Sequence, residues 1–157
     1  ATTADAWEVL GTRLATQFSN NIRNNFGFLN RSEDSDPNAR DKTFRQEGRK
    51  VFKEVVPIAA AHIEGHLSDL GHAPSAVRRY WLHQANQGMN QLVIKKLAGD
   101  ASADLAPLIL DEFANTASAG SIIAFHKHRA DLAAGDVGVI CSFGAGYSVG
   151  SVVLRKR

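Results

Sequence analysis

The alternation of short apolar segments with longer segments of helical periodicity constrains the fold of this chain most. Apolar segments typical of buried β-strands occur at residues 80–83, 108–110 and 137–143, and helical patterns separate them. Strands that alternate with helices predict a layered α/β domain. Residues 149–154 follow residues 137–143 after a glycine-containing turn, and we expect the two segments to pair as a hairpin, which makes the predicted sheet mixed.

The first 41 residues are less regular. Residues 7–15 fit a strand, because Trp7 and Val9 alternate with polar residues, but Trp7, Leu10 and Leu14 also have helical spacing. Residues 19–41 are rich in Asn, Asp, Ser and Arg and predict a long loop.

Three helices are predicted after this loop. The first covers residues 42–70, with Pro57 expected to kink or split it. Asn86 is expected to cap the second helix, which Gly99 ends, and the third helix covers about residues 119–132.

Composition narrows the class of protein. The chain has 157 residues, with 18 Lys and Arg against 16 Asp and Glu, and so small an excess of positive charge argues against nucleic-acid binding as the main task. The single cysteine excludes an intrachain disulfide and a cysteine zinc cluster, and no apolar run is long enough to span a membrane. The chain opens on Ala1 rather than on methionine, so either a processed terminus or a piece of a longer protein is expected.

Polar or glycine-containing loops follow all three apolar segments. His83-Gln84-Ala85-Asn86 follows the first, residues 112–118 follow the second, and residues 144–147 follow the third. In open α/β sheets, ligands bind outside the carboxyl ends of the strands, so the three loops could converge on one pocket. The alternative is that each loop is an ordinary turn.

Three motifs, in this order, resemble the C-terminal half of β-ketoacyl-acyl-carrier-protein synthase III. They are residues 83–86, Asn115-Thr116 followed by small residues and a helix, and residues 142–146; residues 48–53 are also similar to a helix of that family. The resemblance implies the C-terminal half of a thiolase fold, with a mixed five-stranded sheet covered by helices. Residues 1–157 would form this C-terminal thiolase-like domain, and the N-terminal half with the nucleophilic cysteine would be absent from the chain.

The resemblance also implies a chemistry. An acyltransferase of this kind catalyses decarboxylative Claisen condensation of an acyl-CoA primer with malonyl-acyl-carrier protein in fatty acid biosynthesis. His83 and Asn115 would be the catalytic pair that donates hydrogen bonds to the enolate oxygen, and the backbone at Gly144 and Ala145 would serve the acyl-thioester oxyanion. Ala145 departs from the glycine common in the family. No metal or nucleotide cofactor is implied.

The same resemblance implies partners for the chain. They are the N-terminal half on a separate or cleaved chain, the acyl carrier protein, and a second copy of the whole enzyme, which is expected to be cytoplasmic and inactive without its N-terminal half. Residues 87–90 lack the basic residue that often contacts the carrier protein in the family, so Lys95 and Lys96, or Arg45 and Arg49, are the candidates for that contact. The alternative function is a non-catalytic thiolase-like module that binds acyl groups or acts as a scaffold.

Other signals receive simpler interpretations. Cys141 lies within an apolar segment and is expected to be a buried small hydrophobe rather than a nucleophile. Residues 146–150 match the G-x-S-x-G pattern, but neither His nor Asp follows in the chain, as that nucleophile motif requires. His62 and His66 share a helix face, which we interpret as solvated rather than as a zinc site.

Overall fold

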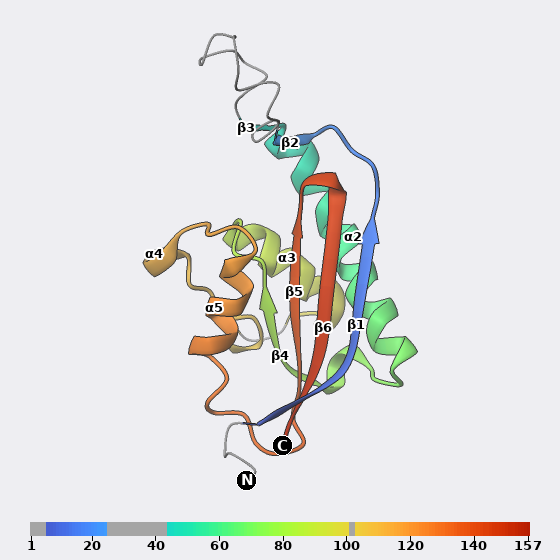
Figure 1. The fold of residues 1–157 in the computed structure, drawn as a ribbon, viewed down its shortest axis with the longest axis vertical. Coiled ribbons are helices and arrows are strands. Elements are labelled where there is room, and N and C mark those ends of the chain that lie inside the picture. Colours follow the sequence, from blue (N-terminus) through green and yellow to red (C-terminus); the bar gives the residue numbers. More distant parts are fainter. Residues whose placement is uncertain (1–5, 25–43, 101–102) are drawn as a thin grey trace, which may run out of the picture.

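The computed structural model describes residues 6–24, 44–100 and 103–157, and in these ranges it shows a mixed main sheet with helices on both faces (Figure 1). The strand order is β1-β6-β5-β4, in which β4 and β5 run parallel and the other neighbours run antiparallel. The four strands are β1 (Trp7–Thr16), β4 (Val77–Leu82), β5 (Val137–Gly144) and β6 (Ser148–Lys156). The layered α/β architecture and the β5–β6 hairpin are thereby confirmed, and residues 7–15 form a strand rather than a helix.

Two helices cover one face of the sheet and a third covers the other face. The helices α2 (Gly48–Asp69) and α3 (Gln87–Ala98) belong to one hydrophobic cluster with alternate residues of β5, whereas α5 (Ala119–Lys127) packs on the opposite face around Trp81. The alternation follows from the two-residue period of a strand, which sends successive side chains to opposite faces. No helix within the described ranges is long and apolar enough to cross a membrane.

The first predicted helix begins six residues later than expected. Residues 44–46 form the short strand β3 (Phe44–Gln46), which pairs with β2 (Ile22–Asn24), so α2 begins only at Gly48. Pro57 lies on the exposed side of α2 and does not split it, because the helix continues to Asp69. Residues 25–43, which contain most of the predicted loop 19–41, lie outside the described residues.

The prediction of a fifth strand at residues 108–110 is wrong. The segment passes from the 3₁₀ turn η3 (Ala103–Leu105) into the short helix α4 (Leu110–Phe113), which leaves β4 as the edge strand of a four-stranded sheet among the described residues. Ile109 is fully buried, as its apolar character predicts, but its backbone N–H donates to the side chain of Gln84 and not to a neighbouring strand. The third helix also ends earlier than predicted, at Lys127.

Candidate active site

The three loops predicted to converge do line one cavity. This cavity, of about 660 Å³, is bounded by four residues singled out from the sequence, His83, Asn115, Gly144 and Ala145. They come from the ends of β4 and β5 and from the segment before α5. The geometry therefore favours a shared pocket over three unrelated turns.

His83 is held at the end of β4 by a continuation of the sheet pairing. Its backbone N–H donates to the carbonyl oxygen of Cys141 at 2.8 Å, and its ring packs edge-on against Phe143 with 5.0 Å between centroids. The side chain is only 8% exposed, and burial lowers the pKa of the imidazole, although a backbone hydrogen bond at Ala117 acts in the opposite direction. A neutral imidazole carries one N–H donor, which is the form that hydrogen bonding to an anionic oxygen requires.

Nδ1 of His83 is buried and has no hydrogen-bond partner among the described residues. Buried polar atoms in folded proteins are almost always paired, and an exception indicates a catalytic role or a missing ligand or water.

Asn115 presents its amide group in one orientation. The side-chain oxygen accepts a hydrogen bond of 3.0 Å from the backbone N–H of Ala117, so the NH₂ group is the end that remains for a ligand. The residues at 114 and 117 are both alanines in the left-handed region, with φ of 52° and 53°. Such conformations are costly for a residue with a side chain and gather at functional sites.

The turn between β5 and β6 forms the third wall. Gly146 has a φ of 135°, and a Cβ atom there would lie 2.6 Å from Oγ of Ser148, so only glycine fits this position. A Cβ atom at Gly144 would meet nothing within 4 Å. The backbone at Gly144 therefore borders the open space of the cavity, where a ligand can approach it closely.

Gln84 supports the site without lining the cavity, a role that the sequence motif did not reveal. It is fully buried, its Nε2 donates to the carbonyl oxygen of Leu82 at 2.9 Å, and its Oε1 accepts from the N–H of Ile109 at 3.0 Å. A Cβ atom at Gly120 would lie 2.9 Å from the Cβ atom of Gln84, so α5 approaches this side chain closely. Gln84 thus ties the loop of His83 to the chain segment that leads to Asn115.

The rest of the cavity wall is mostly apolar. Side chains from β1, β2, α2, α3 and β6 contribute to it, among them Leu14, Ile22, Val51, Val55, Met89 and Val149. A wall of this kind with a few convergent polar groups at one end suits a ligand that has an apolar chain and a polar head.

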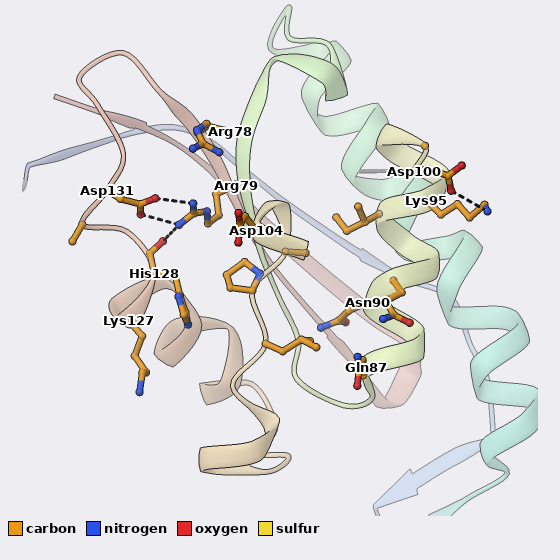
Figure 2. Close-up of a pocket in the computed structure, with 17 residues that line it drawn as sticks. Arg78, Arg79, Gln87, Asn90, Lys95, Asp100, Asp104, Lys127, His128 and Asp131 are labelled. Atoms are coloured by element: carbon orange, nitrogen blue, oxygen red, sulfur yellow. Dashed lines mark hydrogen bonds and ion pairs between the residues drawn. The ribbon is translucent and has the colours of Figure 1, made fainter. Parts of the chain in front are cut away.

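Lys95 and Lys96 lie away from these residues, on α3. Lys95 pairs with Asp100 at 3.1 Å and lines a separate cavity of about 940 Å³. Figure 2 shows this cavity, with the Lys95 pair on one side and Arg79, which pairs with Asp131 at 2.8 Å, on the other. Contact of Lys95 and Lys96 with a carrier protein therefore stays a prediction.

Two of the competing signals can be assessed. Cys141 is fully buried, and burial raises the pKa of its thiol to about 12, so it is not the reactive thiolate of this pocket. The interpretation of His62 and His66 as a solvated face is wrong, because both rings are buried against Ser151 of β6. Within the described ranges, no three His, Cys, Asp or Glu side chains are grouped as a metal site would require.

Comparison with known proteins identifies the family. The profile of the 3-oxoacyl-[acyl-carrier-protein] synthase III C-terminal family matches residues 67–156. The chain belongs to this family. A β-ketodecanoyl-[acyl-carrier-protein] synthase of Pseudomonas aeruginosa is 59% identical over 152 residues, which are 96% of this chain and 43% of that protein. A β-ketoacyl-[acyl-carrier-protein] synthase III of Gloeobacter violaceus is 33% identical over 119 residues, which are 74% of this chain and 36% of the relative.

Solved structures show the same fold. The 3-oxoacyl-[acyl-carrier-protein] synthase III of Aquifex aeolicus superposes with a TM-score of 0.78 at 22% identity, covering 98% of this chain and 46% of that one. The corresponding synthase of Pseudomonas aeruginosa gives a TM-score of 0.75 at 25% identity, covering 94% and 44%. The fold is therefore that of one half of a thiolase-like synthase, and the chain spans less than half the length of these relatives.

Proposed function

We propose that this chain is the C-terminal part of a condensing enzyme that joins an acyl-CoA primer to malonyl-acyl-carrier protein in fatty acid biosynthesis. The observation that carries the proposal is the shared cavity, in which a buried imidazole with a lowered pKa and an amide with a free NH₂ group line the same space as a glycine-containing turn. The N-terminal half, with a nucleophilic cysteine, would complete the site.

The proposed reaction begins with loading of the primer: the thiolate of the cysteine in the N-terminal half attacks the acyl carbon of acyl-CoA, the acyl thioester on the cysteine forms, and the thiolate of coenzyme A leaves. Decarboxylation of malonyl-acyl-carrier protein follows. The bond between the malonyl carboxylate and its methylene carbon breaks, CO₂ leaves, and the electron pair moves onto the thioester oxygen as an enolate. His83 and Asn115 each donate an N–H to that oxygen, and such a donor is typically worth about 10²–10³ in rate.

The enolate carbon then attacks the acyl thioester on the cysteine. The carbon–carbon bond forms, the negative charge passes through the acyl oxygen, and the cysteine thiolate leaves. Backbone N–H groups at Gly144 and Ala145 would stabilise the charge on the acyl oxygen, a role that needs no side chain and so tolerates alanine at position 145.

Exposed apolar side chains support a missing partner segment. Leu14 and Phe18, in and just after β1, are 87% and 84% exposed. Exposed apolar side chains close to one another along the chain fit a surface that another protein segment covers. We assign that surface to the N-terminal half, and we propose the homodimer of the whole enzyme and carrier-protein docking near Lys95 and Lys96 as further contacts.

The product proposed for the whole enzyme is a medium-length β-ketoacyl chain. The Pseudomonas aeruginosa relative is named for a β-ketodecanoyl product, and the apolar wall of the cavity, which includes Val51, Val55 and Met89, suits an acyl chain. A non-catalytic acyl-binding module would use the same wall. A cysteine at the start of a buried helix in the N-terminal half distinguishes the two, because only the enzyme needs it.

The test uses the full-length protein with His83→Ala and Asn115→Ala. Each substitution is expected to slow CO₂ release from a malonyl thioester by about 10²–10³, while intact-mass spectrometry still shows acylation of the cysteine. His72→Ala, just after α2 and outside the cavity, is the control and should leave both steps unchanged. Unchanged CO₂ release in both site variants would contradict the proposal.

A further inference from the structure

A triangle of hydrogen bonds joins three segments that lie far apart in the sequence. The phenol of Tyr147 donates to Oε2 of Glu54 at 2.8 Å, and Nδ2 of Asn21 donates to the same oxygen at 2.9 Å. The amide of Asn21 also lies 3.1 Å from the phenol oxygen, so each of the three side chains contacts the other two. The triangle connects α2, the chain just before β2, and the turn between β5 and β6.

Backbone hydrogen bonds hold the same turn from a second side. The N–H of Gln17 donates to the carbonyl oxygen of Tyr147 at 2.8 Å, and the N–H of Ser19 donates to that of Gly146 at 2.6 Å. The turn is therefore attached to the chain after β1 through its backbone and to α2 through the Tyr147 side chain.

Among the three side chains of the triangle, the buried hydroxyl of Tyr147 most needs a hydrogen-bond partner. It is only 1% exposed, and a buried phenol needs a hydrogen-bond partner. The carboxylate of Glu54 supplies a charge-assisted acceptor, which makes a shorter and stronger bond than a neutral one. The Tyr147 ring is therefore held by the packing around it and by the hydrogen bond from its hydroxyl to Glu54.

We propose that Glu54, acting through Tyr147, is a positioning residue for the backbone of the β5–β6 turn. This inference rests on the proposed function, in which the backbone at Gly144 and Ala145 serves the acyl-thioester oxygen. None of the hydrogen bonds of the triangle reaches the loops of His83 or Asn115. The triangle therefore governs acyl transfer to and from the cysteine, and decarboxylation does not depend on it.

The test compares the two half-reactions in the full-length protein. Tyr147→Phe and Glu54→Leu are expected to slow cysteine acylation by about tenfold or more, because small displacements of catalytic groups cost up to about 10² in rate. CO₂ release from a malonyl thioester should stay within about twofold, because its donors are untouched. Glu54→Gln keeps an oxygen acceptor and should restore acylation, and Glu64→Leu, on the exposed side of the same helix, is the matched control.

The outcomes separate this inference from the proposed function. Equal loss of both half-reactions, or no loss of acylation, would overturn the positioning role of Glu54. If the full-length protein lacks both half-reactions, the proposed function fails. Hydrogen exchange then tests separately whether the triangle holds the β5–β6 turn in place. Exchange of the Gln17 and Ser19 amides should be faster in Tyr147→Phe than in the unaltered protein, because these amides donate to the turn. Unchanged exchange would show that the triangle does not hold the turn.

Discussion

Acid should destabilise this protein through a buried pair of histidines on α2. His62 and His66 are 7% and 4% exposed, and one ring nitrogen of each lies 2.9 and 2.7 Å from Oγ of Ser151. Burial is the main cause that lowers both imidazole pKa values, and the positive charge of Arg13 adds to it. The negative charge of Asp69 raises the pKa of His66 and so opposes these effects, but it does not act on His62.

The magnitude follows from linkage between protonation and folding. Both pKa values are lower in the folded state than the usual value of 6.5, so the unfolded chain binds protons that the folded protein excludes. The stabilising contribution of the neutral rings is complete above about pH 6.5 and is lost as the pH falls toward the folded-state pKa values. Each excluded proton is worth about 1.4 kcal/mol per pH unit, and the pair gives a slope of up to about 2.7 kcal/mol per pH unit.

The assay is urea unfolding at pH values from 8 to about 5. The double variant His62→Gln, His66→Gln keeps polar partners for Ser151 but does not titrate, so its free energy of unfolding should depend less on pH, by up to that slope. His72→Gln, outside the cluster, is the control and should keep the original slope. An unchanged slope in the double variant would refute the reasoning.

Three further substitutions or treatments test the packing. Asn86→Ala removes the cap that accepts from the N–H of Met89 at 3.3 Å, and should lower the free energy of unfolding by about 1 kcal/mol in a urea titration. Gly138→Ala places a Cβ atom 2.3 Å from Cζ3 of Trp81, and should cost about 1–3 kcal/mol and shift the tryptophan fluorescence. Cys141 should resist iodoacetamide at pH 8 in the folded protein and react in urea, because burial raises its thiol pKa to about 12.

The sequence predicted those parts of the fold whose signals are local. Residues 137–143 and 149–154 form the expected hairpin because an apolar run, a glycine-containing turn and a second apolar run lie within about 18 residues of one another. The meeting of the His83 loop with the β5–β6 turn was also predictable, since the carboxyl ends of the parallel strands β4 and β5 gather at one edge of the sheet. The Asn115 loop reaches the same cavity although it follows the helix α4 and not a strand.

The errors arose where distant residues decide the structure. Residues 108–110 have the composition of a strand, but Gln84, some 25 positions away, takes up the N–H of Ile109 that a neighbouring strand would otherwise bind. His62 and His66 read as a polar helix face because their common partner, Ser151, lies on a strand more than 80 residues later. Helical spacing shows which residues share a face but does not show what covers that face.

The triangle of Asn21, Glu54 and Tyr147 had no sequence signal for the same reason. Glu54 is 33 positions from Asn21 and 93 positions from Tyr147, and the three residues belong to separate segments of the fold. Gln84 is an intermediate case, since a polar residue directly after a buried strand and next to His83 is a signal that can be recognised before the structure is known.

The central claim is that the imidazole of His83 and the amide of Asn115 bind one thioester oxygen. The most direct measurement is a crystal structure of the full-length protein with a malonyl-thioester analogue that cannot lose CO₂. We expect a ring nitrogen of His83 and Nδ2 of Asn115 each to lie about 2.7–3.1 Å from the same oxygen. An oxygen in contact with only one of the two groups, or a thioester bound outside the cavity they share, would contradict the account.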